Sequence, residues 1–552
     1  MPHSKTDRVQ PAPTRKSSTA LLGAAFFLLL VTPLVVFLKH HGYGLFRAEV
    51  LVAYLALAGV ATILMLISQR WRWACPVLLG GAIALFADIQ FDAVSDGPWL
   101  PIIFLAATVV MFVLRGREGE LLVPVLSTIL AVSALQSSPT AMPRPLPAST
   151  ARADLPVIVH LILDEHIGIE GMPAGPMDTI AGELRASLES RGFLLFGGAY
   201  SQHVNSNYSI SHLLNYEHGR YRDELVGPGS AGFRWQVQSN AYLEEAARSG
   251  YRLRVYQPEY MNLCTPALLD RAQCYTYRST SAEVLQHTPL SAVDRLALLF
   301  GLYRERASMW HEFVSYYGRA KRKLGAAGVW LPRLTSDRVR LWPFATESTL
   351  ARLRGDLATA QSGDMYVAHL LLPHDPYVFD ADCQLRPRRE WLYREDLDAP
   401  RGQINTAEGR LRRYSAYAEQ VRCVQTRVAD LLAAVPAPLQ GQTVVIMQGD
   451  HGSRLSERDP LPSTVKRLMP ADYVDSYSTL FAVKLPSTSA GYDPRPAAIP
   501  CLLQSVVDGE FREVRGIDRC HQPAKVFLRS GNGPTLEQPL PPLERPRAPG
   551  PD

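Results

Sequence analysis

The sequence predicts a multi-pass α-helical membrane domain followed by an extracytoplasmic α/β sandwich with a largely parallel central sheet. Three observations lead to this fold class. Long apolar runs occur only between residues 20 and 136 of the 552. Beyond them, short apolar runs alternate with amphipathic stretches, as the strands and helices of an α/β fold do. Of the seven cysteines, only Cys75 lies in the apolar part, and the other six suit an exported domain with disulfides.

Five apolar runs predict five transmembrane helices. The first run, residues 20–38, has the length that a bilayer-spanning helix needs. The other four are separated by short polar turns and cover residues 50–68, 75–91, 99–114 and 120–136. A cleavable signal peptide would account for the first run only. We therefore expect a cytoplasmic N-terminus at 1–18 and a membrane domain at 19–137.

Basic residues in the short loops predict the orientation of these helices, because cytoplasmic loops are enriched in Lys and Arg. Such residues precede the first run and follow the second and fourth: Lys5, Arg8, Arg15, Lys16, Arg70, Arg72, Arg115 and Arg117. The end of the third run carries Asp88, Asp92 and Asp96 instead, although Lys39 and Arg47 run against the pattern. An odd number of spans then places the C-terminal part outside. We expect a protein of the inner (cytoplasmic) membrane with a periplasmic, or otherwise extracytoplasmic, domain.

The six outer cysteines fall into neighbouring pairs along the chain, which are Cys264 with Cys274, Cys383 with Cys423 and Cys501 with Cys520. Six cysteines allow about fifteen connectivities, so the sequence predicts disulfides without fixing their pairing. The absence of any C-x-x-C spacing disfavours zinc binding by thiols. The net charge of +5 and the lack of a basic stripe exclude nucleic acid as the expected partner.

The outer part divides into a linker, a folded domain and a tail. Residues 138–156 are rich in Pro, Ser and Ala and predict a linker. The folded domain is expected over 157–530, with a helical insertion of unassigned role at 280–345. The tail at 531–552 is Pro-rich and predicted to be unfolded. Within the domain, strands are expected at 157–163, 193–200, 251–257, 365–372 and 443–448, and helices at 177–192, 241–250 and 407–435.

Three of the expected strands end in side chains of metal-binding type. One ends at Asp164-Glu165-His166, another continues into Pro373-His374-Asp375, and the third ends at Gly449-Asp450-His451-Gly452. Each alone would pass as a strand-terminating turn. The carboxyl ends of parallel strands meet at one edge of a sheet, so the three together predict a shared site. Carboxylates and imidazoles favour zinc, with manganese or calcium as alternatives.

A serine-rich segment, residues 201–217, follows the second expected strand and runs into an apolar helix start. A Ser at a helix N-terminus lies where backbone N–H groups favour anions such as phosphate. For any single serine, helix capping is the competing explanation.

Together these stretches resemble the alkaline phosphatase/sulfatase superfamily, and in particular its membrane-anchored bacterial branch of phosphoethanolamine and phosphoglycerol transferases. The matching stretches are LILDEH, the 201–217 segment, HLLLPHDPY and QGDHG, in that order, between about residues 155 and 455. The resemblance implies five N-terminal helices and one extracytoplasmic alkaline phosphatase-like domain. The Cys/Ser-x-Pro-x-Arg signature of true sulfatases is absent, which disfavours hydrolysis of sulfate esters.

The resemblance also implies roles for individual residues. Metal ligands are expected at Asp164, Glu165, Asp450, His451 and the nucleophile itself. His369 and His374 are expected to face the phosphate and the leaving group. The branch carries Thr-x-x-Ser before the helix, and this chain has Ser206 and Ser209 at that spacing. Ser206 is thus the expected nucleophile and metal ligand. Ser209 and then Ser211 are the next candidates for the nucleophile. If Ser206 is the nucleophile, Ser209 is expected to bind substrate.

The expected activity is a metal-dependent phosphoryl-group transferase or hydrolase that works through a phospho-serine intermediate. A membrane lipid donor and an envelope glycan or lipid acceptor are the expected partners. Two alternatives stay open. One is a sulfatase or phosphodiesterase of the same fold. The other is an inactive sulfatase-like domain that binds an envelope ligand or a partner protein.

Overall fold

The computed structural model describes residues 15–91, 99–135, 152, 154–175, 177–229, 233–326, 329, 331, 334, 338–394, 405–521, 523–529 and 533–546. Contacts divide the chain into two compact units. Unit 1 comprises Met1–Ala141 and Ser281–Val329, and unit 2 comprises Met142–Thr280 and Trp330–Asp552. The continuous range expected for the outer domain, 157–530, is thus interrupted by a segment that folds with the N-terminal helices. Most of the expected N-terminus at 1–18 and linker at 138–156 lies outside the described residues.

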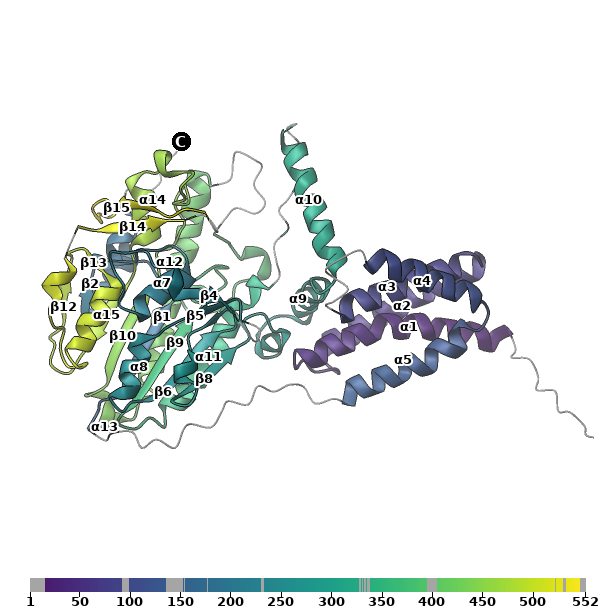
Figure 1. The fold of residues 1–552 in the computed structure, drawn as a ribbon, viewed down its shortest axis with the longest axis horizontal. Helices are drawn as coiled ribbons and strands as arrows, with labels where there is room; N and C mark the ends of the chain where they lie inside the picture. Colours follow the sequence, from purple (N-terminus) through teal and green to yellow (C-terminus); the bar gives the residue numbers. More distant parts are fainter. Residues whose placement is uncertain are drawn as a thin grey trace, which may run out of the picture. The chain divides into compact units, whose positions relative to one another are not determined.

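Unit 1 contains a helix at each of the five apolar runs, namely α1 (Arg15–His40), α2 (Ala48–Arg70), α3 (Ala74–Gln90), α4 (Trp99–Val113) and α5 (Glu118–Leu135) (Figure 1). Three of them, α1, α2 and α5, are long and apolar enough to cross a membrane. With 17 and 15 residues, α3 and α4 are shorter than the roughly 20 residues that a bilayer requires. The apolar helices are confirmed, whereas five membrane crossings stay a prediction. Helices α9 (Ala292–Arg304) and α10 (Ser308–Ala326) complete this unit.

Unit 2 is built on an eight-stranded sheet with the order β12-β2-β11-β10-β1-β9-β6-β8. Its strands are β1 (Ile158–Leu163), β2 (Leu194–Phe196), β6 (Arg252–Pro258), β8 (Ala272–Tyr277), β9 (Asp364–Leu370), β10 (Val444–Gly449), β11 (Phe481–Lys484) and β12 (Gly491–Asp493). Five neighbouring pairs are parallel, and only β11 runs antiparallel to its neighbours. The predicted α/β fold with a largely parallel sheet is confirmed.

Two sets of helices flank this sheet, as expected for strands that are apolar on both faces (Figure 1). One set is α7 (Ser206–Leu214), α8 (Ala241–Arg248) and α15 (Ile499–Asp508), and the other is α6 (Asp178–Ser190), α11 (Trp342–Leu357) and α12 (Ala407–Leu432). Alternate residues of β1 face the two sets. Ile158 and Ile162 join the core that contains Leu213 of α7 and Leu503 of α15. The central strands are therefore fixed from both sides.

Short elements complete unit 2. They are the strands β3 (Ala199–Tyr200), β4 (Val226–Pro228), β5 (Trp235–Val237), β7 (Met261–Asn262), β13 (Ala497–Ala498), β14 (Lys525–Leu528) and β15 (Leu536–Pro539), with helices α13 (Ala437–Gln440) and α14 (Pro470–Tyr477). The tail predicted to be unfolded differs from that expectation over residues 533–546. There β15 pairs with β14, and Leu540 and Leu543 are buried. Apolar residues between the prolines pack into the fold. A prediction from overall composition does not detect such residues.

Three disulfides join the neighbouring cysteine pairs, Cys264–Cys274, Cys383–Cys423 and Cys501–Cys520. The second links the loop after β9 to α12, and thereby holds the segment that carries His374 against the body of unit 2. Cys75 is free and buried.

Candidate active site

The three central strands end together at one edge of the sheet. They are parallel, and Leu163 at the end of β1 is in register with Leu370 of β9 and Gly449 of β10. All residues of these strands are buried, which fixes their register on both faces. The residues that follow β1 and β10, Asp164 and Asp450, are consequently neighbours in space. The convergence predicted from the strand endings is present in the structure.

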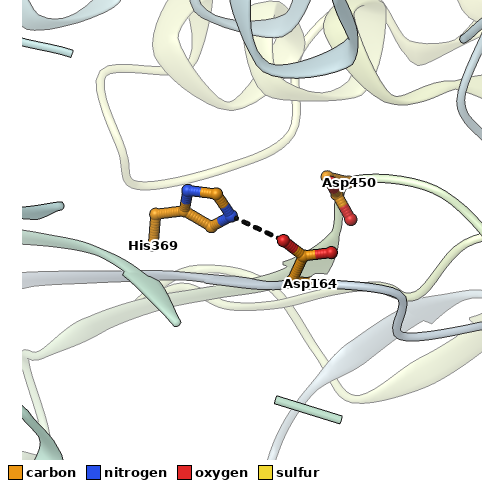
Figure 2. A group of neighbouring side chains, drawn as sticks. All are labelled: Asp164, His369 and Asp450. Atoms are coloured by element: carbon orange, nitrogen blue, oxygen red, sulfur yellow. Dashed lines mark hydrogen bonds and ion pairs between the residues drawn. The ribbon is translucent and has the colours of Figure 1, made fainter. Parts of the chain in front are cut away.

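Asp164, Asp450 and His369 form a compact group of possible ligand atoms, all within 4.8 Å of one another. His369 comes from β9 itself rather than from the loop after it. Figure 2 shows its ring directed at Asp164, with Nε2 at 3.3 Å from Oδ2. None of the three residues is more than 2% exposed. Two carboxylates and an imidazole thus face each other inside the protein.

Several atoms of this group have no hydrogen-bond partner within the described part of the chain. They are Oδ1 of Asp164, Oδ2 of Asp450 and Nδ1 of His369, all fully buried. An unpaired buried carboxylate oxygen is energetically costly. Burial and the neighbouring Asp164 raise the pKa of Asp450 to about 6, because two adjacent buried carboxylates resist both being ionised. A divalent cation would satisfy these oxygens and balance their charge, so the residues fit a metal such as zinc or manganese.

Ser206 is the first residue of α7 and lies beside this group. Its Oγ is 3.4 Å from Nε2 of His451. Nδ1 of His451 faces the carbonyl oxygen of Gly452 at 3.0 Å, which directs Nε2 toward Ser206 and toward Oδ2 of Asp450 at 3.3 Å. Burial and the nearby Arg454 lower the pKa of His451 to about 3, so the ring is neutral at pH 7. A neutral imidazole is the form that binds a metal.

The other two candidate serines lie in different surroundings. The hydroxyl of Ser209 donates a 2.5 Å hydrogen bond to the carbonyl oxygen of Asp450 and lies 2.9 Å from Oγ of Ser201. Ser209 is 1% exposed and supports the loop that carries Asp450, and its expected contact with substrate stays a prediction. Ser211 is fully buried farther along α7. Of the three serines, Ser206 alone makes a side-chain contact with the histidine of the QGDHG segment.

A second group lies next to the first and contains Glu165, His374 and Asp375. Glu165 has a φ of +63°, a left-handed conformation that is rare outside glycine. Its Oε1 accepts a 2.9 Å hydrogen bond from Nε of Arg454 and a further bond from the same guanidinium. Glu165 was expected among the metal ligands. Its Oε1 pairs with Arg454, while its Oε2 is buried with no hydrogen-bond partner among the described residues, so its role as a ligand stays a prediction. The two adjacent acids after β1 therefore belong to different groups.

His374 lies between two carboxylates of this second group. Its Nε2 is 3.4 Å from Oε1 of Glu165, and its Nδ1 is 3.1 Å from Oδ1 of Asp375. Burial opposes the charged form, but Glu165 and Asp375 outweigh it and raise the pKa of His374 to about 10. His374 is therefore protonated at neutral pH and can act as a proton donor.

Sequence reasoning missed three residues of the site. Tyr260 points its hydroxyl at Oδ2 of Asp164, at 3.2 Å, and at Nε2 of His369, at 3.4 Å. Trp342, at the start of α11, stacks on Tyr260 and contacts the ring of His374 edge to face. Arg454 is the third. A signal existed for Tyr260, because it follows β6, which is parallel to β9 and ends at the same edge.

The glycines of the QGDHG segment serve close packing. Neither Gly449 nor Gly452 has a positive φ. A Cβ at Gly452 would instead lie 1.9 Å from the carbonyl oxygen of Asp475, and one at Gly449 would lie 2.3 Å from that of His166. Any side chain at either position would displace the loop that carries Asp450 and His451.

No family model and no curated protein matches the chain. Comparison with solved structures does return matches. They include a 2-O GAG sulfatase, BT1596, at 13% identity, covering 68% of this chain and 78% of that one, with a TM-score of 0.41. The phosphonate monoester hydrolase of Agrobacterium radiobacter matches at 12% identity over 68% of this chain and 80% of its own, with a TM-score of 0.39.

A further match is the C-terminal periplasmic domain of EcEptC from Escherichia coli, in complex with Zn, at 11% identity, with a TM-score of 0.39. It covers 72% of this chain and 96% of that one. Since the TM-scores are low, the chemistry of this chain is inferred from its own side chains.

Proposed function

We propose that unit 2 is a metal-dependent phosphoryl-group transferase or hydrolase with Ser206 as its nucleophile. One observation carries this proposal. A serine hydroxyl at a helix N-terminus lies beside a buried group of two carboxylates and two histidines whose oxygens are only partly satisfied. Such a group holds a cation next to a nucleophile, which phosphoryl transfer requires.

Asp164, Asp450, His451 and His369 would hold the metal, with Ser206 as a further ligand. When bound, the metal supplies a positive charge that lowers the pKa of the Ser206 hydroxyl and stabilises the charge on the phosphoryl oxygens. The N-terminus of α7 adds to this effect, because the helix dipole favours an anion there. Its N-cap residue, Asn205, makes no side-chain capping bond, so it does not compete with a phosphate for the first N–H groups.

The reaction would pass through a covalent intermediate on the protein. Oγ of Ser206 forms a bond to phosphorus while the bond to the leaving oxygen breaks on the opposite side. Protonated His374 gives its proton to the leaving alcohol, and Glu165 and Asp375 orient the ring for this step. A second hydroxyl, from water or from an acceptor molecule, then attacks the phospho-serine and restores Ser206.

The substrate proposed from the resemblance is a membrane lipid donor with an envelope glycan or lipid acceptor. Three helices long enough to cross a membrane support a location at the membrane. We place the protein in the inner membrane with unit 2 outside the cytoplasm, from the loop charges and the three disulfides. Phosphate and sulfate esters share the tetrahedral geometry that this site would bind, so the experiment includes both.

The test is turnover of nitrophenyl phosphate monoesters, diesters and nitrophenyl sulfate by the detergent-solubilised full chain. Metal content of the same sample is measured by mass spectrometry. We expect bound zinc or manganese, hydrolysis of a phosphate ester, and loss of turnover in Ser206→Ala. After a short reaction, a phosphoryl group should be found on the peptide that contains Ser206.

Ser211→Ala is the matched control, because it removes a buried hydroxyl from the same helix without touching the ligand group. Retained turnover in Ser206→Ala would overturn the covalent mechanism. Faster turnover of the sulfate ester would favour the sulfatase alternative. A protein without metal and without turnover would favour a binding domain.

A further inference from the structure

Helix α10 carries an exposed apolar stripe that no part of the described chain covers. Met309, Phe313, Tyr316 and Leu324 recur at the spacing of one helix face and are 51%, 50%, 63% and 40% exposed. Trp310 and Tyr317 flank this stripe, half-buried. The opposite side holds His311 and Ser315, and Glu312 lies at the border of the stripe. An exposed stripe of large apolar residues on an otherwise polar helix marks a binding surface.

The charges on α10 indicate what covers the stripe. The C-terminal half of the helix carries the basic residues Arg319, Lys321, Arg322 and Lys323, and no acidic residue follows Glu312 in the helix. On a helical wheel, Lys321 and Lys323 border the apolar arc on its two sides. Long basic side chains in this position reach from an apolar surface toward phosphate groups. Apolar stripe and basic border together are typical of a helix that lies in an anionic lipid surface.

Contacts within unit 1 attach α10 and its neighbour α9 to particular ends of the apolar helices. Asp88, in the last turn of α3, accepts a hydrogen bond from the backbone N–H of Met309 at 3.2 Å and another from the Ser308 hydroxyl. A carboxylate at this position stabilises the start of α10. At the start of α2, buried Glu49 pairs with Arg295 of α9 at 3.1 Å.

These attachment points lie at the same ends of the apolar helices. The end of α3 and the start of α2 are the ends that the loop charges predict to be outside. The loop between α1 and α2 is attached in the same way, because Gln286 donates to the carbonyl oxygen of Gly42 at 2.8 Å and accepts from the N–H of Gly44 at 3.0 Å. The segment Ser281–Val329 is therefore held where the apolar helices leave the bilayer.

We propose that α10 lies in the outer surface of the membrane, with Phe313 and its stripe among the acyl chains and its basic residues at anionic phospholipid headgroups. Val293 and Phe300, seven residues apart on α9 and 74% and 62% exposed, would extend the same contact. This inference concerns unit 1 and does not depend on the activity proposed for unit 2.

The test uses the full chain with Cys75 replaced by Ser, in nanodiscs of phosphatidylcholine alone or with one third phosphatidylglycerol. A fluorophore is attached at Phe313→Cys or, as the matched control, at Ser315→Cys on the polar side. We expect nitroxide-labelled lipid to quench the Phe313→Cys label at least threefold more than the Ser315→Cys label. Aqueous iodide should show the opposite order. Nitroxide near the headgroup should quench more than nitroxide at mid-chain.

A second comparison tests the charges. Quenching of the Phe313→Cys label should increase with phosphatidylglycerol, and Arg319→Gln with Lys323→Gln should abolish the increase. Glu312→Gln, which removes an acidic residue from the same helix, should preserve it. Equal iodide access at both labels would overturn the proposal in favour of a helix in solution. Low access to both quenchers would indicate a protein partner and overturn it as well. If phosphatidylglycerol increases quenching equally in the double variant, the part of the proposal that assigns anionic headgroups to the basic residues is wrong.

Discussion

Two neighbouring groups of acids and histidines at the sheet edge differ in how their charge is balanced. Among the described residues, no Lys or Arg side chain hydrogen-bonds to Asp164, Asp450 or His369, and one oxygen of each carboxylate has no partner. The group of Glu165 and His374 contains Arg454, which forms a buried ion pair with Glu165. The two acids are consecutive in sequence, so their difference lies in what surrounds them. The second group contains a buried guanidinium from the chain itself, whereas the first group has no such partner among the described residues and is where the cation is proposed to bind.

The largest effect is expected from Asp450→Asn, which removes one unpaired oxygen and one charge from the first group. Turnover should fall by about 10,000-fold or more, since nucleophile activation and charge stabilisation are each worth roughly 100-fold. The bound metal should be lost as well. The control is Asp475→Asn, because that buried acid is already bonded to Tyr414 and Ser453. Metal retained at full occupancy in Asp450→Asn would contradict the assignment.

His374→Gln should have the next largest effect, because it removes the proton donor of the second group. We expect turnover to fall by about 100-fold. Substrates with a good leaving group should lose less activity than substrates with a poor one. Metal content should stay unchanged, which separates this variant from Asp450→Asn. The measurement is kcat for aryl phosphates whose leaving groups differ in pKa. An equal loss across that series would exclude proton donation by His374.

Arg454→Met should destabilise the protein by about 3–5 kcal/mol, because buried Glu165 loses its closest counter-ion and keeps only His374 beside it. Adding Glu165→Gln to Arg454→Met should recover most of that loss, since position 165 then carries no buried charge that needs the guanidinium. Denaturant unfolding of the full chain in detergent provides the comparison. If the double variant is no more stable than Arg454→Met alone, the ion pair is not the cause.

The smallest effect is a pH dependence of the first group. The pKa of Asp450 is raised to about 6 in the folded, metal-free protein and is near its ordinary value of about 3.9 in the unfolded chain. The folded state therefore binds the proton more tightly between these values. Metal-free stability should rise by at most about 1.4 kcal/mol per unit as pH falls from 6 to 4.

Metal affinity should change in the opposite direction over that window, falling by about tenfold per pH unit as the proton competes. Titrations of zinc at pH 7, 6 and 5 would measure it. Asp450→Asn, which has no proton to exchange at this position, should lose the pH dependence of metal-free stability. An affinity that does not vary between pH 7 and 5 would contradict the raised pKa.

The main strands and the carboxylates at their ends could be predicted from the sequence. Asp164 and Asp450 could be predicted because parallel strands with apolar residues on both faces must end at one edge. The division between Asp164 and Glu165 could not, because it depends on the left-handed backbone of Glu165 and on Arg454, which is 289 residues away along the chain. Likewise, nothing in the sequence pairs Asp88 with Ser308, although an acid inside an apolar run indicates that a partner exists.

The position of β1 between β9 and β10 has a consequence for biosynthesis. Asp164 appears early in the chain, but its neighbours His369 and Asp450 are made 205 and 286 residues later. The site proposed for the metal is incomplete until β10 has emerged and paired with β1. With unit 2 exported as proposed, the metal can enter only after almost the whole chain has been translocated. The proposed enzyme would then acquire its ion from the supply outside the cytoplasm and have no activity during synthesis.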